Sequence, residues 1–196
     1  MKIKFASLLL ASSLILAACG SEDEKTTEVK ENQEETTTET PVAVTEETSL
    51  DWDQADFENR FNSFIAENQL AITPLAGQIE EGEVQNTLSY DLTPHSSMVA
   101  MVNKDTSKIK DIMMIGAGDG SEDSGLNIMV SLGSLIAAAD PTLSAQDRGA
   151  IMKELGFGDE TKDLMNLKEE TSRNGIKYKM SSSEITGFIL GVTKES

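Results

Sequence analysis

Beyond its many carboxylates, the chain carries few side chains that could act as nucleophiles, metal ligands or general bases. Its 196 residues include one cysteine, Cys19, and one histidine, His95, against 34 aspartates and glutamates. A single cysteine excludes an intramolecular disulfide framework and a cysteine-rich zinc site. A serine–histidine–aspartate triad could use only His95, and nothing near it in the sequence supports one. The G-x-S-x-G and H-E-x-x-H motifs of hydrolases and zinc peptidases do not occur.

A glycine-rich segment, residues 116–125, partly matches the spacing of a calcium-binding loop. Asp119, Ser121 and Asp123 stand at the first, third and fifth positions of such a loop. The sixth position holds Ser124 instead of glycine, and the twelfth lacks the usual glutamate. A phosphate does not fit either, because the carboxylates would repel it and no lysine stands at the P-loop position. We interpret the segment as a loop that caps the next helix, with irregular calcium binding as the alternative.

His95, Met98 and Met101 raise the question of copper, because imidazole and thioether ligands suit Cu(I). In a strand, Met98 and Met101 would point to opposite faces, since they are an odd number of positions apart. His95 would lie about 20 Å from Met101 along an extended chain. We therefore expect the methionines to fill the core, and we assign no metal ligand.

Residues 107–110 read S-K-I-K and match the S-x-x-K pattern of penicillin-binding enzymes. That serine should begin a helix, whereas this segment predicts a turn that enters a strand, and no K-T-G partner motif occurs. Carboxylates are numerous enough for the acid–base pair of a glycoside hydrolase, but no spacing singles out a pair. The sequence thus indicates no catalytic residue and no cofactor.

The most specific pattern lies in the first twenty residues. Two lysines precede an apolar run of about 12 residues, which is too short to span a bilayer and predicts a signal peptide over residues 1–18. The run ends in Leu16-Ala17-Ala18-Cys19, which resembles the lipobox of bacterial lipoproteins. The resemblance implies cleavage between Ala18 and Cys19 and an S-diacylglyceryl group on the Cys19 thiol. In some lipoproteins an N-acyl group is also added to the α-amino group that cleavage releases on the cysteine.

A lipid on Cys19 would place the mature chain on the extracytoplasmic face of a bacterial cell membrane. Two acyl chains anchor a protein firmly, where one chain is marginal. No later stretch approaches 18 apolar residues, so the sequence predicts a lipid anchor and no spanning helix.

An acidic segment follows the anchor over residues 20–48. It is rich in threonine and glutamate, has no aromatic residue, and contains ten carboxylates against two lysines. This composition predicts a disordered tether that extends from Cys19, with a root-mean-square span of roughly 30 Å. Such a tether is similar to those of Gram-positive lipoproteins. The alternative is an acidic arm that binds a cation or a partner.

The net charge of −18 limits the partners of the chain. Binding to nucleic acid requires lysine and arginine against the phosphates, so no nucleic-acid partner is expected. The charge also opposes docking on anionic lipid through a basic patch. We expect contact with the membrane through the lipid alone, and a protein, peptide or glycan of the envelope as partner.

Residues 49–196 predict one α+β domain. Phe57, Phe61, Phe64 and Ile65 share a helical face, with Ser49 or Asp51 as the expected N-cap. Further helices are expected near residues 125–139, capped by Asp123 or Ser124, and near 144–155. Strands are expected near residues 84–92, 98–102, 109–115, 176–180 and 185–192, with a hairpin turn at Asn174-Gly175. Residues 164–171 are expected to begin as a helical turn and to continue as a strand.

The expected element order is α-βββ-αα-βββ. Runs of strands separated by helices favour a mainly antiparallel sheet of five or six strands with helices on one face. The two similar runs raise the question of a distant duplication, for which element order is the only sign.

Three functional hypotheses fit the sequence. The first is a non-enzymatic surface lipoprotein whose domain binds a protein, peptide or envelope component. The second is a small cell-envelope hydrolase that uses acidic residues. The third concerns the leader, because some Gram-positive lipoprotein leaders that resemble residues 13–18 release short signalling peptides.

The lipid anchor gives a direct test. Replacing Cys19 by serine removes the thiol that accepts the diacylglyceryl group, so we expect the variant to lose acylation and to leave the membrane fraction. Fractionation of cells and immunoblotting measure this partition. Unchanged membrane retention of the Cys19→Ser protein would contradict the anchor.

Overall fold

The structure, a computed structural model, describes residues 49–195. The predicted signal peptide, the predicted lipidation of Cys19 and the predicted tether all fall outside the described residues. Within this part of the chain no helix is both long and apolar enough to cross a bilayer.

Seven antiparallel strands form one sheet in the order β1-β2-β3-β4-β7-β6-β5. The predicted α+β class, element order and antiparallel sheet are confirmed, with a two-residue strand added at one edge. The strands are β1 (Ile79–Glu80), β2 (Asn86–Thr93), β3 (Ser96–Val102), β4 (Ile109–Gly116), β5 (Lys168–Arg173), β6 (Ile176–Ser183) and β7 (Gly187–Lys194).

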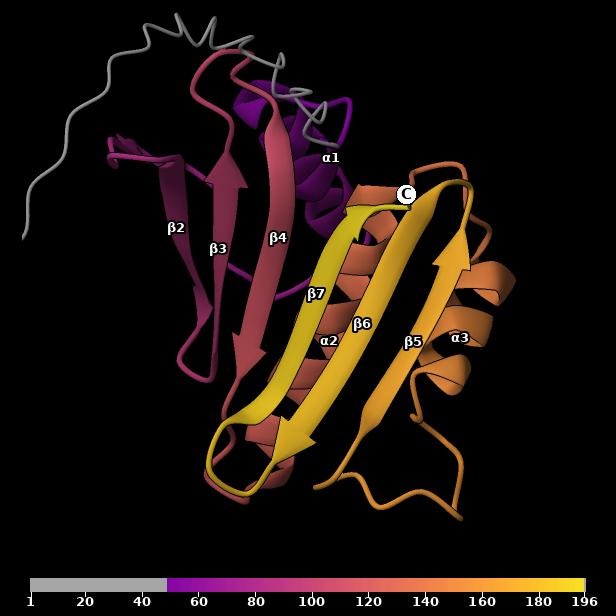
Figure 1. The fold of residues 1–196 in the computed structure, drawn as a ribbon. Coiled ribbons are helices and arrows are strands. Elements are labelled where there is room, and N and C mark those ends of the chain that lie inside the picture. The colour runs from indigo at the N-terminus through magenta and orange to yellow at the C-terminus, as the bar shows by residue number, and fades with distance from the viewer. Residues whose placement is uncertain (1–48, 196) are drawn as a thin grey trace, which may run out of the picture. The chain divides into compact units, whose positions relative to one another are not determined.

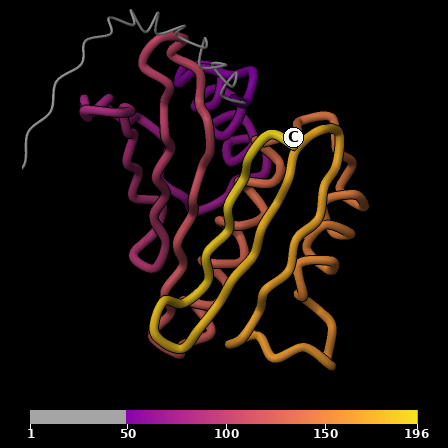
Figure 2. Tube along the Cα trace, viewed as in Figure 1, coloured from indigo at the N-terminus to yellow at the C-terminus, as the bar shows by residue number. Residues whose placement is uncertain are grey.

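Two three-stranded meanders make up most of the sheet. Strands β2, β3 and β4 follow one another in sequence and in space, and so do β5, β6 and β7. The meanders meet where β4 pairs with β7, in a register that runs from Asp111 opposite Thr193 to Gly116 opposite Phe188. Figures 1 and 2 show these two strands side by side although they lie far apart in the sequence.

Three helices cover one face of this sheet: α1 (Gln54–Glu67), α2 (Glu122–Ala139) and α3 (Ala145–Glu154). In Figure 1 all three lie behind the strands. Each meander is thus preceded by helical structure that packs on the same side. The core lies between the two layers, where the fully buried Leu132, Leu135 and Ile136 of α2 belong to one cluster with Met98 and Met114 of the sheet.

Helix α1 begins later than predicted. Its N-cap is Asp53, whose carboxylate accepts from the Asp56 amide in a capping box, and neither Ser49 nor Asp51 caps it. The reason is that residues 50–52 pair with β4: the Leu50 amide donates to the Ile109 carbonyl at 2.8 Å, and the Ile109 amide donates to the Trp52 carbonyl at 2.9 Å. A chain held in this extended pairing cannot also form the first helical turn.

The face of α1 agrees with its predicted spacing. Phe57, Phe61 and Ile65 are buried in the core, as a helix with apolar residues three or four positions apart requires. Phe64 is only partly buried, and the Arg148 guanidinium lies 5.3 Å from the centre of its ring.

The second helix also starts at a different residue from the one predicted. Ser121 caps α2 by accepting from the Ser124 amide, so the helix begins at Glu122 and not near Gly125. Neither Asp123 nor Ser124 is the cap. Ser144 caps α3, which agrees with the helix expected near residues 144–155, and Gly156 follows its end with a left-handed backbone, φ +99°.

Two strands, β2 and β7, begin later than predicted because a bend precedes β2 and a turn precedes β7, whereas β5 follows a turn as expected. Val84 precedes β2 and is 87% exposed, and Ile185 is 95% exposed in the turn between β6 and β7. Strand β5 begins at Lys168, after a turn closed by the Asn166 amide on the Asp163 carbonyl. The predicted hairpin turn at Asn174-Gly175 is confirmed, with φ of 52° and 77°.

Gly187 allows a test of the junction between the meanders. It has φ +67°, and a β carbon there would collide with the Gly116 carbonyl of β4. We expect Gly187→Ala to lower the unfolding free energy by more than about 2 kcal/mol, through the unfavourable backbone and the collision. Urea unfolding of the mature protein in detergent micelles, followed by Trp52 fluorescence, measures the loss.

Gly191→Ala is the matched control in the same strand. Its added methyl group has room, since the nearest atom would lie 3.9 Å away. We expect a change of less than about 0.5 kcal/mol. Equal losses for both variants would contradict the account of the junction.

Candidate functional site

One face of the sheet is not covered by any helix of the described residues (Figure 1). We call it the open face. Side chains alternate between the two faces along each strand, and the register aligns those of the open face in rows across six strands. The rows, from β2 to β5, are Thr87, Met101, Asp111, Thr193, Lys177, Ser172; then Ser89, Val99, Met113, Gly191, Lys179, Glu170; then Asp91, Ser97, Ile115, Ile189, Ser181, Lys168.

The centre of the open face is apolar. Val99 and Met101 of β3, Met113 and Ile115 of β4 and Ile189 of β7 form what we call the apolar strip. Each of the five side chains is partly exposed. The solvated face of an antiparallel sheet ordinarily carries polar residues, and here the outer strands do so, while six of the nine open-face positions on β3, β4 and β7 are apolar or glycine. Contiguous exposed apolar surfaces are typical of sites of interaction.

A hollow of about 530 Å³ lies beside the strip, where Gly191 contributes no side chain. Met113 and Ile189 provide its apolar wall, and Lys179 and Glu170 lie on its other side. Lys177 and Lys179 both approach the Glu170 carboxylate, at 3.9 and 3.8 Å. Exposed ion pairs of this length stabilise little, so these side chains can rearrange around a ligand.

Asp111 lies at the end of the apolar strip and on the rim of the hollow. Burial raises the pKa of its carboxyl above the ordinary value, and the nearby charge of Lys110 lowers it in part. Asp111 forms no ion pair with a described residue. A cationic group of a partner would therefore relieve a charge that the fold holds at a cost.

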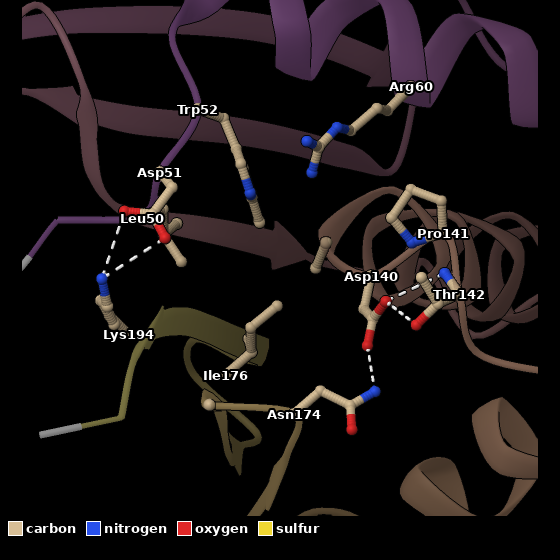
Figure 3. A pocket seen from close by; sticks show the side chains of 12 residues that line it. Leu50, Asp51, Trp52, Arg60, Asp140, Pro141, Thr142, Asn174, Ile176 and Lys194 are labelled. Carbon is tan, nitrogen blue, oxygen red and sulfur yellow. Dashed lines mark hydrogen bonds and ion pairs between the residues drawn. The ribbon is translucent and has the colours of Figure 1, made fainter.

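A second hollow, the Trp52 pocket, lies where the chain enters the domain (Figure 3). It has a volume of about 530 Å³. Four parts of the chain meet there: the segment before α1 with α1 itself, the end of α2, the turn between β5 and β6, and the end of β7. Its lining residues are Leu50, Asp51, Trp52, Arg60, Ala139, Asp140, Pro141, Thr142, Asn174, Gly175, Ile176 and Lys194.

Charges of both signs face each other in the Trp52 pocket. The Arg60 guanidinium lies 5.0 Å from the centre of the Trp52 ring. Asp140 is buried at the C-cap of α2 and accepts hydrogen bonds from Thr142 and Asn174. Burial acts to raise the pKa of the Asp140 carboxyl, but these hydrogen bonds outweigh it and hold the pKa below its ordinary value. Asp140 is therefore a carboxylate at neutral pH.

The Asp140 charge also reaches Tyr178 of β6. Burial raises the pKa of the Tyr178 hydroxyl, and the negative charge of Asp140 raises it further. This hydroxyl is buried and has no hydrogen-bond partner among the described residues. The core thus leaves this polar group unsatisfied, and Tyr178 is not among the residues that line the Trp52 pocket.

The structure gives the glycine-rich loop a capping role. The Asp119 carboxylate accepts from the Ser121 backbone amide at 2.9 Å. Hydrogen bonds with Ser121 and Ser124 lower the pKa of the Asp119 carboxyl. Asp123 lies within α2. Within residues 49–195 no three histidine, cysteine, aspartate or glutamate side chains are grouped closely enough to hold a metal ion.

The other candidate residues are dispersed over the sheet. Met98 is buried towards the helices, and Met101 lies on the open face, as their odd spacing predicts. The expectation that the methionines fill the core is therefore wrong for Met101, which is partly exposed. His95 lies in the turn before β3. Ser107 closes a turn with φ +57° before β4, in agreement with the turn predicted for residues 107–110. Cys19 and Ala18 lie outside the described residues.

Comparison of the chain with models of protein families, with curated proteins and with solved structures finds no match. The apolar strip and the Trp52 pocket were not predicted from the sequence. Alternation within strands could have identified the strip, because Val99, Met101, Met113 and Ile115 are apolar at positions opposite in parity to the core residues.

Because the pKa of Asp111 is raised in the folded state, its carboxyl lowers stability at neutral pH and ceases to do so in acid, whereas carboxyls with lowered pKa values do the opposite. A carboxyl whose pKa is raised by folding destabilises the protein above that pKa, and the penalty disappears as the pH falls through it. We expect Asp111→Asn to raise the urea midpoint at pH 7, and the gain to shrink by pH 4. Asp91→Asn, an exposed carboxylate on the same face, is the control without such a gain. A loss of stability at pH 7 for Asp111→Asn would contradict the assignment.

Proposed function

We propose that this protein is a lipid-anchored protein of the bacterial cell surface whose folded domain binds another extracytoplasmic protein through the open face. The apolar strip carries the proposal. Five partly exposed apolar side chains are contiguous on this face, whereas a sheet face in contact with water ordinarily carries polar side chains. Binding of a partner would remove them from water.

The extent of the open face fits a protein partner. Six strands about 4.8 Å apart, with three rows of side chains, give a flat area of about 500 Å². Specific protein interfaces bury about 800 Å² per partner, so the face with its rim approaches that size. A strip of methionine and aliphatic side chains also adapts to the shape of a partner, because methionine is flexible.

The charges indicate what the partner presents. Residues 49–196 contain 24 acidic and 12 basic residues, whereas the open face has three of each: Asp91, Asp111 and Glu170 against Lys168, Lys177 and Lys179. The open face is therefore a nearly neutral area on an acidic domain. A partner with an apolar centre and a basic rim fits this pattern, while anionic polymers or a second copy of the domain are repelled.

The predicted anchor and tether support the same function. A lipid on Cys19 holds the domain near the membrane, and a tether over residues 20–48 gives it reach. Confinement of this kind raises the effective concentration of the domain around membrane-bound partners. A modest affinity of the open face would then be sufficient for binding on the cell.

Site-specific photocrosslinking on intact cells tests the proposal. With p-benzoylphenylalanine at Ser97, beside the apolar strip, we expect one discrete protein adduct, and none with the same group at Asn127 of α2. A second substitution, Ile115→Lys, places a charge in the strip and should remove the adduct.

Leu126→Lys is the matched control for the added charge, since Leu126 is 62% exposed on α2. We expect it to leave the adduct unchanged. No adduct from position 97, the same adduct from position 127, or an adduct that survives Ile115→Lys would each contradict binding through the open face. Mass spectrometry of the adduct shows whether the partner is a basic protein, as expected, or a second copy, which would refute the charge argument.

A further inference from the structure

The Trp52 pocket contains a cation, Arg60, that makes no ion pair with a described residue, although its positive charge reaches Asp140 and helps to lower the pKa of that carboxyl. Arg60 forms no ion pair there, and the Trp52 ring is the contact that holds its guanidinium. Figure 3 shows the guanidinium directed into the space between Trp52 and Asp140. A guanidinium has five N–H donors in a planar fork that matches a carboxylate. This side of the pocket therefore suits a carboxylate.

The opposite side of the pocket suits a cation. Asp140 Oδ1 accepts from the Thr142 backbone amide at 2.9 Å and from the Thr142 hydroxyl at 2.6 Å. Asp140 Oδ2 accepts only from the side-chain amide of Asn174, at 2.6 Å. A carboxylate can accept about four hydrogen bonds, so Oδ2 retains a free position. Asp140 also stands at the C-terminus of α2, where the helix dipole is negative and favours a positive charge.

A ligand with one charge would be opposed in this pocket. An anion drawn to Arg60 and Lys194 would be repelled by Asp140 and Asp51. A cation drawn to the two aspartates would be repelled by the arginine and the lysine. Arg60 and Asp140 do not pair directly, which leaves space between them for ligand atoms. A ligand with both charges satisfies both sides.

The geometry points to a zwitterionic ligand, an amino acid or a short peptide with free ends, bound in the Trp52 pocket. Its ammonium group donates to Asp140 Oδ2, and its carboxylate accepts from Arg60. Trp52 and Ile176 provide an apolar wall for a side chain, and a volume of about 530 Å³ accommodates a ligand of this size. The site shares no residue with the open face and does not depend on it.

Fluorescence gives a direct test, because Trp52 is the only tryptophan in the chain. The mature protein in detergent micelles is titrated with alanine, Ala-Ala and Ala-Ala-Ala, and with Ala-Ala blocked by N-acetylation or C-amidation. We expect a saturable change with the unblocked ligands at a Kd of about 1 mM or tighter. Each block should weaken binding at least tenfold. Tighter binding of alanine assigns the site to free amino acids, and tighter binding of the peptides assigns it to peptides.

Two variants test whether Arg60 binds the carboxylate of the ligand and Asp140 binds its ammonium group. Arg60→Gln should bind free and amidated Ala-Ala equally, because its discrimination at the carboxylate is lost, while still favouring a free amino end. Asp140→Asn should show the reverse. Arg148→Gln, which removes the arginine over Phe64 and does not line the pocket, should bind like the unaltered protein.

Two results would overturn the assignment. One is the absence of a saturable change with any unblocked ligand. The other is equal affinity for blocked and unblocked Ala-Ala in the unaltered protein. If Asp140→Asn fails to fold, Arg60→Gln still tests the assignment, because it should lose the discrimination between free and amidated Ala-Ala and keep the preference for a free amino end.

Discussion

The pairing of β4 with β7 is the contact on which the rest of the structure depends. Each meander forms from neighbours joined by short turns, which close at little cost in entropy. The β4–β7 ladder joins strands that are far apart in the sequence and makes one sheet of two halves. At its end, Gly187 lies so close to the Gly116 backbone that a β carbon has no room. The same ladder places Ile189 beside Ile115 and so completes the apolar strip.

The position of the helices determines which surface is left for function. Helical structure precedes each meander and packs on the same face, so the core is closed on one side and the other side stays open. The outer strands of the open face carry lysine, serine and acidic side chains, while its centre is apolar. A net charge of −18 opposes self-association of molecules that expose such a strip.

Local signals in the sequence were sufficient for the class of fold. Apolar spacing identified the buried face of α1, Ser144 marked the start of α3, and Asn174-Gly175 marked the hairpin. Competition with tertiary contacts explains the errors. Pairing of residues 50–52 with Ile109 displaced the N-cap of α1 to Asp53. The Trp52 pocket could not be predicted, because it joins four separate segments of the chain. Alternation in β3 and β4 indicates most of the apolar strip, and only the contribution of Ile189 requires the pairing of β4 with β7.

Methionine oxidation on intact cells tests most directly whether the open face is covered in the envelope. Met101 and Met113 lie on the open face, Met98 and Met114 lie buried on the same two strands, and Met129 is exposed on α2. In the purified mature protein, we expect Met101, Met113 and Met129 to oxidise while the buried pair resists. On intact cells, Met101 and Met113 should be protected severalfold and Met129 should not. Equal oxidation of Met101 and Met113 in both preparations would contradict the central claim that a partner occupies the open face.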